Sequence, residues 1–281
     1  MTATPPFPQH PSSLASGTEP LKRIAIFAAT VWEADAVRAV LSIGAERRIG
    51  GVRVWVSAVG PREYWLARTG VGPKKAGQVA AHVLAQQSFS LAVSTGFACA
   101  LVAADIGALL AGHEVIRDRT DDSDSISVID VPGVERDALL ALVPGSGSSF
   151  HLGRFVSVAH IVGLATDKRR LAHGTGAIGL DMESAALAVE AEKAQVPFVV
   201  VRAVSDLVDE DLPLDFNHFL RPTAWLRGIA TLLAAPSKFV ELARLRRQSM
   251  AAAKSLTMFF KRYIAVQASG SIRAEFVTGP L

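Results

Sequence analysis

The chain has 281 residues, of which half are apolar and a fifth are charged. That length suits one large α/β domain or two small ones, and the composition is too apolar for a disordered protein. No apolar run reaches the ~18 residues that a membrane-spanning helix needs, and the Pro- and Ser-rich segment 4–11 lacks the pattern of a secretory signal. The lone cysteine, Cys99, excludes an internal disulfide and a cysteine metal cluster. We therefore expect a cytoplasmic protein whose residues 1–20 form a disordered leader.

The first half of the chain alternates between strand and helix patterns. Short apolar or alternating runs predict strands, and apolar residues at helical spacing predict helices. The predicted strands are 22–28, 52–59, 64–68 and 90–95, and the predicted helices are 32–41 and 76–87. The last of these strands would end at Gly96, with 95–98 as a turn.

The second half continues the alternation. The predicted strands are 109–116, 150–158, 177–180 and 197–203, and the predicted helices are 132–143, 166–171 and 183–194. Thr166 is a candidate N-cap for the short helix. The acidic segment 118–127 predicts a solvated loop, and the chain after it ends in helices that start near Pro222 and Pro236.

The order of these elements predicts an α/β fold. Several strands are apolar on both faces, which is typical of a sheet covered by helices on both sides. We expect a single domain over residues 21–235 with a central mixed, largely parallel twisted sheet. Residues 236–281 would form a C-terminal helical extension.

Polar residues gather just after four predicted strands. Sheets of this kind bind ligands beyond the carboxyl ends of their strands. Glu33, the glycine-rich piece 95–98, the triplet 181–183 and the pair Ser205-Asp206 all occupy such places. Three of the four supply a carboxylate, so we expect an acidic pocket at this edge.

Each of these groups also has a purely structural explanation. Glu33 and Glu183 could be acids in first helical turns, where they suit the helix dipole. Asp206 could cap the turn after its strand, and Thr95-Gly96 could be only a tight strand exit.

Three segments resemble one enzyme family. GLDMESAALAVEAEKAQVPFVVVRAVSD (179–206) resembles the signature of the purine nucleoside phosphorylase and methylthioadenosine/S-adenosylhomocysteine nucleosidase superfamily. IAIFAATVWEA (24–34) resembles the family's first strand, and STGFACAL (94–101) its glycine-rich loop facing the sugar. The resemblance covers roughly residues 22–212 and implies cleavage of a purine N-glycosidic bond.

The resemblance also implies roles for particular residues. Asp206 would donate a proton or hydrogen bond to N7 of the purine, and Glu33 would orient or deprotonate the attacking water. Glu183 would hold the ribose hydroxyls while Met182 packs against the sugar. The other substrate-binding residues that it implies are Asp181, Ser205, Thr95, Gly96, Phe97, Ala98, Ile161 and Val162.

The chemistry of the reaction agrees with those roles. A purine leaves poorly until its ring nitrogen is protonated, and its departure leaves an oxocarbenium-like sugar. We therefore expect Asp206 to have a raised pKa in a dry pocket and Glu33 to stay ionised. No metal or cofactor is expected.

The nucleophile is predicted to be water, with phosphate as the alternative. The phosphate-using branch often has Gly-Asp-Pro and an arginine after its first strand, where this chain has Ala28-Ala29-Thr30 and then Glu33. Against this, Arg117, Arg119 and Arg154 could serve an anion. Cys99 stands where many relatives have glycine.

Two other motifs are set aside. Gly70-Val71-Gly72 with Gly77 is an incomplete dinucleotide loop with no clear ribose-binding acid downstream. The seven histidines (10, 82, 113, 151, 160, 173 and 218) form no convincing metal-ligand spacing, and His160 is expected to be a packing residue.

The C-terminal segment concentrates the positive charge. Residues 236–264 hold seven basic residues and one acidic one, so this stretch carries +6 while the rest of the chain carries −3. The segment predicts either a helix packed on the body or a subunit partner, or a basic amphipathic helix on the inner face of an anionic membrane. Nucleic acid is not an expected partner, whereas a homo-oligomer is.

The same tail resembles that of the hopanoid-associated phosphorylases, which implies a lipid-linked adenosine, adenosylhopane, as a candidate substrate. An alternative of another class is a non-catalytic module that binds purine or lipid.

Overall fold

The computed structural model describes residues 21–41, 44–117, 127–145, 149–212 and 237–269. The expectations for the leader 1–20, for most of the acidic loop 118–127, and for Pro222 and Pro236 lie outside these residues. Within them, one sheet contains twelve strands. The strands are β1 (Lys22–Ala28), β2 (Ala45–Ile49), β3 (Val52–Val59), β4 (Arg62–Arg68), β5 (Leu91–Ala100), β6 (Leu109–Gly112), β7 (Val115–Arg117), β8 (Ser127–Ile129), β9 (Phe150–Leu152), β10 (Phe155–Ser157), β11 (Gly179–Asp181) and β12 (Phe198–Asp206).

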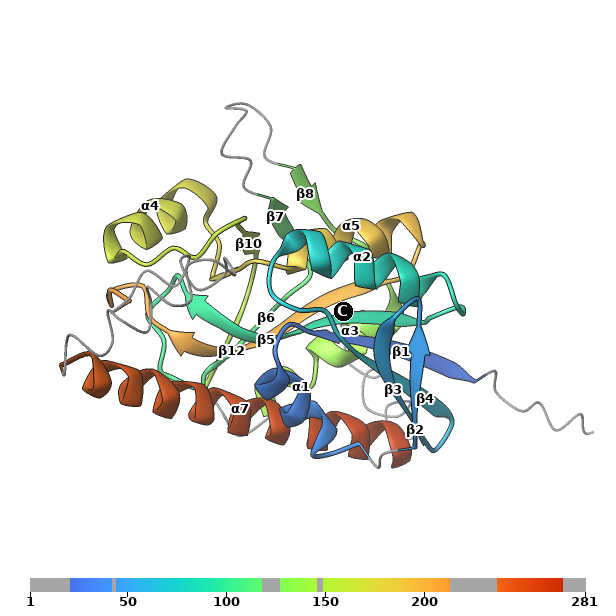
Figure 1. Cartoon of the computed structure of the whole chain (residues 1–281). Coiled ribbons are helices and arrows are strands. Elements are labelled where there is room, and N and C mark those ends of the chain that lie inside the picture. Colours follow the sequence, from blue (N-terminus) through green and yellow to red (C-terminus); the bar gives the residue numbers. More distant parts are fainter. Residues whose placement is uncertain (1–20, 42–43, 118–126, 146–148, 213–236, 270–281) are drawn as a thin grey trace, which may run out of the picture.

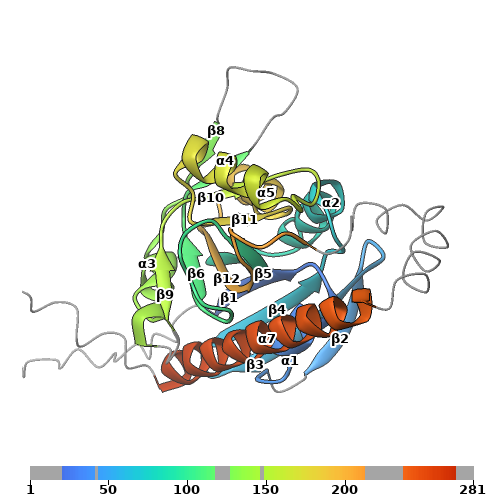
Figure 2. The ribbon, with the colours of Figure 1, turned by 90° about the vertical axis from the view of Figure 1, so that its left-hand side faces the viewer.

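Helices cover both faces of this sheet (Figure 1). They are α1 (Val31–Arg38), α2 (Pro73–Leu84), α3 (Val134–Leu140), α4 (Ala165–Thr175), α5 (Ser184–Lys193) and α7 (Ser237–Ser269), with a short 3-10 helix at Val143–Gly145. In Figure 1, α2 and α5 lie above the sheet, while α1 and the long α7 lie below it. Figure 2 shows α7 running across that lower face.

The centre of the sheet is parallel and its outer parts are mixed. β1 pairs in parallel with β4 and β5, and β12 extends the parallel set on the far side of β5. β11 runs antiparallel to the end of β5, and β6 runs antiparallel to β12. The predicted α/β class with a mixed, helix-covered sheet is therefore confirmed.

Two apolar cores stabilise the layers. Phe27, Val83 and Phe198 belong to the cluster between the sheet and α2 and α5. Ile26, Val201 and Phe259 belong to the cluster between the sheet and α1 and α7. Burial on both faces explains why β1 and β12 read as continuous apolar runs.

Several predicted boundaries were wrong. Strand β5 does not end at Gly96 but continues through the expected turn 95–98 to Ala100. The predicted strand 109–116 is divided between β6 and β7, and the predicted strand 150–158 between β9 and β10. Helix α4 begins at Ala165 after Leu164, so Thr166 lies inside the helix and is not its cap.

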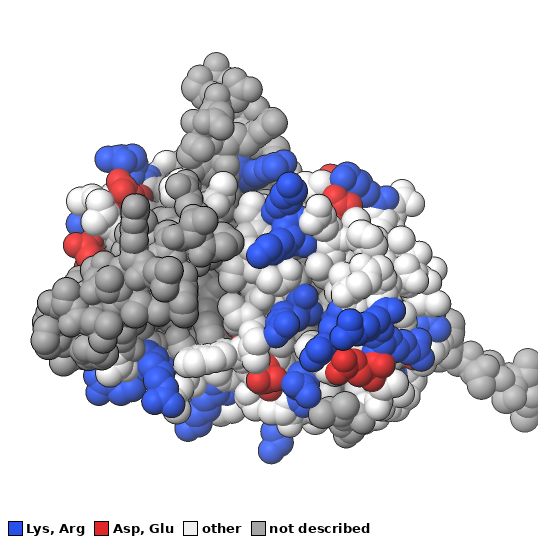
Figure 3. Space-filling model, in the orientation of Figure 1, with Lys and Arg blue, Asp and Glu red and all other residues white. Residues whose placement is uncertain are grey.

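Helix α7 packs on the body of the protein. Leu256, Phe259, Phe260 and Tyr263 are completely buried, and they face the cluster that also contains α1 and the sheet. The outer face of α7 keeps exposed cations, and Lys and Arg side chains also gather along the lower edge of Figure 3, where α7 runs. The structure thus supports packing on the body for the apolar face. In the described residues, none of the helices is apolar over a stretch long enough to span a membrane.

Candidate active site

A pocket of about 380 Å³ opens where the carboxyl ends of β1 and β12 meet the last residues of β5. The β1–α1 turn, β5, the β10–α4 connection, the β11–α5 junction, β12 and α7 all contribute to its wall. The lining residues are Ala29, Thr30, Glu33, Val71, Phe97, Ala98, Cys99, Val158, His160, Ile161, Val162, Leu180, Asp181, Met182, Glu183, Arg202, Ser205, Asp206, Leu212, Leu245 and Ser249. The sheet edge predicted to carry an acidic pocket therefore does so.

Glu33 is fixed at the start of α1 by a capping box. The Oγ1 of Thr30 accepts a hydrogen bond from the Glu33 amide at 3.3 Å, while Thr30 N and Oγ1 donate to Glu33 Oε2 at 2.7 and 2.8 Å. The other oxygen, Oε1, accepts from the Phe97 amide at 2.7 Å. These three hydrogen bonds to its oxygens hold the buried Glu33 side chain in one orientation.

Gly96 makes room for that carboxylate. Its backbone φ is +143°, a conformation that residues other than glycine rarely adopt. A Cβ at this position would lie 2.3 Å from Glu33 Oε1. Gly96 thus allows β5 to continue past the acid instead of turning away from it.

Asp181 is occupied by groups of the protein itself. Its carboxylate accepts hydrogen bonds from the hydroxyls of Ser157 and Ser184 and from the amides of Glu183 and Ser184. It also forms an ion pair with Arg202, with Nε 2.7 Å from Oδ2. These contacts fix the turn that leads from β11 into α5.

Glu183 is the N-cap of α5 and is almost fully buried. Its Oε1 accepts from the Gly72 amide at 2.8 Å, and its Oε2 lies 3.6 Å from Nη2 of Arg202. Burial raises the pKa of Glu183 to about 7, because the opposing effect of Arg202 is smaller and the charges of Asp181 and Glu33 add to the rise. A weak acid of this kind exchanges its proton near neutral pH.

Arg202 lines the pocket, although the sequence reasoning gave it no role. Its guanidinium donates to Phe97 O at 3.1 Å, to Ser94 Oγ at 2.9 Å and to Ser184 Oγ at 3.3 Å. Burial by itself would lower the pKa of Arg202, but Asp181 and the other carboxylates outweigh it and the pKa is raised. A charge inside the apolar strand 197–203 was the available signal, because buried arginines require partners.

Asp206 ends β12 and pairs with a buried lysine. Lys168 Nζ lies 2.8 Å from Oδ1 and 2.7 Å from Oδ2 of Asp206. Burial raises the pKa of Asp206, while Lys168 opposes that rise. The raised pKa expected from the sequence is thus present, but Lys168 was not foreseen.

The structure brings most of the candidate residues together and leaves two outside the wall. Thr95 is buried in β5, and Gly96 lies behind Glu33; neither lines the pocket. The residues that do line it are Glu33, Phe97, Ala98, Ile161, Val162, Asp181, Met182, Glu183, Ser205 and Asp206. His160 and Cys99 also line it, and burial raises the pKa of the Cys99 thiol.

The three arginines considered for an anion do not reach this pocket within the described chain. Arg154 forms an ion pair with Glu114 at 2.7 Å, Arg117 is exposed at the end of β7, and Arg119 lies outside the described residues. Among the residues that the structure describes, Arg202 is the only Lys or Arg in the pocket wall.

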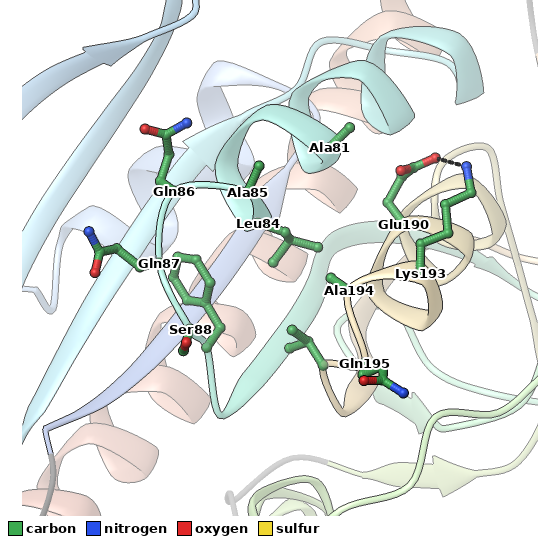
Figure 4. Close-up of a pocket in the computed structure, with 12 residues that line it drawn as sticks. Ala81, Leu84, Ala85, Gln86, Gln87, Ser88, Glu190, Lys193, Ala194 and Gln195 are labelled. Carbon is green, nitrogen blue, oxygen red and sulfur yellow. Dashed lines mark hydrogen bonds and ion pairs between the residues drawn. The ribbon is translucent and has the colours of Figure 1, made fainter.

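A second, larger pocket of about 920 Å³ lies at the opposite end of the sheet, between the carboxyl ends of α2 and α5 (Figure 4). Its polar side chains include Gln86, Gln87 and Gln195. In the described part of its lining, the charged side chains are Glu190 and Lys193, which pair with each other at 2.7 Å. The smaller, acidic pocket is therefore the better candidate for chemistry.

The fold is an α/β sheet covered by helices, with a pocket lined by several carboxyl groups at the carboxyl ends of its strands. The family model of the phosphorylase superfamily matches residues 23–227. The chain belongs to this superfamily.

Solved structures with the same fold agree with that assignment. The 5'-methylthioadenosine/S-adenosylhomocysteine nucleosidase of Helicobacter pylori superposes with a TM-score of 0.69 at 16% identity, covering 89% of this chain and 100% of that one. The corresponding nucleosidase of Neisseria meningitidis gives 0.66 at 18% identity, with 86% and 100% covered. Futalosine hydrolase of Helicobacter pylori gives 0.66 at 17% identity, with 86% and 98% covered.

Proposed function

We propose that this protein cleaves the N-glycosidic bond of a purine nucleoside, with water as the nucleophile. The observation that carries the proposal is the meeting of three carboxyl groups, those of Glu33, Glu183 and Asp206, in the wall of one pocket. The groups come from three separate parts of the chain, and their environments differ. One carboxyl group that delivers a proton and another that activates water are what acid–base cleavage of a glycosidic bond requires.

Asp206 is the proposed acid. Its raised pKa favours the protonated carboxyl group, which would deliver its proton to N7 of the purine. Protonation makes the base a better leaving group, so that the C–N bond breaks and its electron pair stays with the purine. The apolar walls from Val158, Ile161 and Val162 would exclude water around the base.

Glu183 is the proposed ribose-binding group. It lies beside Arg202 and Gly72, and its carboxylate is the one best suited to accept hydrogen bonds from ribose hydroxyls. Negative charge at this position also stabilises the positive charge that develops on the sugar. Because Asp181 is occupied by Ser157, Ser184 and Arg202, we assign it to holding this turn rather than to contacting substrate.

Glu33 is the proposed base that activates water. The capping box and the Phe97 amide hold its carboxylate in one orientation, so that it is pre-organised for a water molecule in the pocket. The water loses its proton to Glu33 as its oxygen bonds to the anomeric carbon.

The charges in the wall favour water over phosphate. A phosphate would need cations that are free to bind it. In the described part of the wall the one Lys or Arg is Arg202, and its guanidinium is already paired with Asp181 and Glu183. Glu33 would repel an anion at the same place. Phosphorolysis is therefore the second candidate, and a non-catalytic binding module is the third.

The neighbours of similar fold support a purine substrate. The Neisseria nucleosidase was solved with methylthio-immucillin-A, and an aspartate-to-asparagine variant of the Helicobacter nucleosidase with 5'-methylthioadenosine in its active site. At 16–18% identity, this similarity shows only a shared fold. The adenine base and the sugar substituent are therefore part of the proposal for the substrate of this protein.

Helix α7 gives that proposal a further element. Leu245 and Ser249 of α7 line the pocket together with Leu212, which places a partly apolar wall beside the acidic groups. We propose an adenosyl compound with an apolar substituent on the sugar, of which adenosylhopane is the lipid-linked form. Contact with an anionic membrane would have to use the outer face of α7, where Arg246, Arg247 and Lys254 are exposed.

The test is purine release from a small panel of nucleosides that includes methylthioadenosine, inosine and adenosylhopane in detergent, with and without phosphate. We expect release of adenine without phosphate and a loss of about 10²–10⁴-fold in Asp206→Asn. Release that depends on phosphate would establish the second candidate, and no release from any nucleoside would favour the third. Much faster cleavage of methylthioadenosine than of adenosylhopane would reject the lipid-linked substrate.

A further inference from the structure

Lys168 is a completely buried cation that does not line the pocket. It lies on α4, directly behind Asp206. Its Nζ donates to Oδ1 of Asp206 and to the backbone carbonyls of Leu207 (3.1 Å) and Glu210 (2.7 Å), and it lies 2.7 Å from Oδ2 of Asp206 as an ion pair. All the donors of this ammonium are thus directed at the end of β12 and at the turn that follows it.

The surroundings of Asp206 contain few other charges. On β5, Cys99 is paired with Asp206 in the strand register. On the turn after β12, the carboxylate of Glu210 is directed toward α7, where it accepts from Gln248 at 3.0 Å and lies 3.6 Å from Arg244. His160 lies in the same pocket wall. Among the described groups, Lys168 is therefore the cation in direct contact with Asp206.

We propose that Lys168 is a positioning residue, whose ammonium fixes the Asp206 carboxyl group toward the pocket and keeps it a strong enough acid to protonate the purine. The inference rests on the proposed function. Burial alone makes a carboxyl group hold its proton too tightly, and an acid is most effective when its pKa lies near the working pH. A neighbouring ammonium corrects for this by stabilising the carboxylate that remains after the proton has moved to N7.

Two variants separate this role from a structural one. Lys168→Met removes both the charge and the hydrogen bonds, whereas Lys168→Gln keeps a side-chain N–H donor for the carbonyls of Leu207 and Glu210 but carries no charge. Arg169→Met is the matched control, because Arg169 lies on the same helix and forms an exposed ion pair with Asp209. Folding of each variant is followed by thermal unfolding.

The readout is the pH profile of kcat/KM. Activity falls on the alkaline side as the acid loses its proton, so we expect this limb to move to higher pH by about 1–3 units in both Lys168 variants. We also expect a larger change in kcat than in KM. The fall in kcat should be smaller than the ~10²–10⁴-fold loss expected when the acid itself is removed. Arg169→Met should match the wild type. A Lys168→Gln variant with the wild-type profile would overturn the proposal, because hydrogen bonds alone would then suffice.

A second measurement does not depend on activity. The carboxyl resonance of Asp206 in ¹³C-labelled protein, assigned by its loss in Asp206→Asn, should titrate at higher pH in Lys168→Gln than in the wild type. If neither Lys168 variant folds, the titration of the Asp206 resonance in the wild type still tests the proposal. An Asp206 carboxyl group that stays protonated throughout the neutral pH range would overturn it. If the wild type cleaves no nucleoside, the proposed function fails while this titration still tests the role of Lys168.

Discussion

Individual side chains at this pocket are distinguished by their hydrogen-bond partners. Glu33 accepts three hydrogen bonds that fix its orientation, whereas the buried Glu183 and the half-buried Asp206 have raised pKa values. Sequence reasoning identified all three residues, because each follows a strand of the predicted sheet. It missed Lys168, which is 38 residues away from Asp206 along the chain, because no sequence pattern predicts the contact between them.

The base role of Glu33 is tested by Glu33→Gln. We expect kcat for purine release to fall by about 10²–10⁴-fold with a smaller change in KM, because an amide cannot take the proton of water. Steady-state kinetics on the best nucleoside of the panel measures both constants. Asp35→Asn, on the exposed side of the same helix, should leave both unchanged. Equal losses in the two variants would point to damage to α1 instead.

The buried carboxyl group of Glu183 makes stability depend on pH. Its pKa of about 7 in the folded protein lies above the ordinary value of 4.5, so the folded state binds this proton more tightly than the unfolded state. Its contribution to stability is therefore fully present below about pH 4.5, is lost as pH rises to about 7, and is level above that.

Replacing Glu183 with Gln should remove this dependence. We expect the Tm of Glu183→Gln to rise relative to the wild type between pH 4.5 and 7, as measured by thermal unfolding across that range. Glu192→Gln, at an exposed position of the same helix, is the control. A difference between Glu183→Gln and the wild type that is the same at every pH would contradict the proposed burial of a titrating group.

Among the secondary-structure elements, the apolar strands were predicted from the sequence and a polar edge strand was missed. β1 and β12 were predicted because they are apolar on both faces. β2 was missed because its sequence, AERRI, is polar and lies exposed at an edge of the sheet. The end of β5 was misjudged because a glycine within a strand looks the same in sequence as a glycine in a turn.

Gly96 is a residue of β5 that lies close to the Glu33 carboxyl group. We expect Gly96→Ala to lower both stability and kcat, because the new Cβ would displace Glu33 and because φ is +143°. Gly77→Ala is the matched control: its Cβ would meet Ala186 at an ordinary 3.8 Å within α2, and we expect a gain in stability of about 0.5–1 kcal/mol. Kinetics and denaturant unfolding measure both. Unchanged activity in Gly96→Ala would show that Glu33 does not depend on this close approach.

At the scale of the whole molecule, α7 completes the lower layer and also reaches the pocket through Leu245 and Ser249. The sequence predicted a helix here but left its partner open, because basic and apolar residues on one helix suit either a protein surface or a membrane. Phe259, Phe260 and Tyr263 are completely buried because the sheet and α1 cover them, and the local sequence pattern does not contain that contact.

The packing of α7 predicts a large effect on stability. We expect Phe260→Ala to lower the free energy of unfolding by about 3–5 kcal/mol, because Phe260 is completely buried. Met258→Ala, two residues earlier on the exposed side, should change it by about 0.5 kcal/mol or less. Urea unfolding gives both values. A small effect of Phe260→Ala would mean that α7 does not stay packed on the body in solution.

In the proposed reaction water attacks the sugar while the purine leaves, and isotope labelling distinguishes this hydrolysis from transfer to phosphate. A single turnover with an adenine nucleoside is run in H₂¹⁸O containing phosphate, and the products are analysed by mass spectrometry. We expect free adenine and a sugar that carries one ¹⁸O at its anomeric position. A sugar 1-phosphate without the label, or an intact nucleoside, would contradict it.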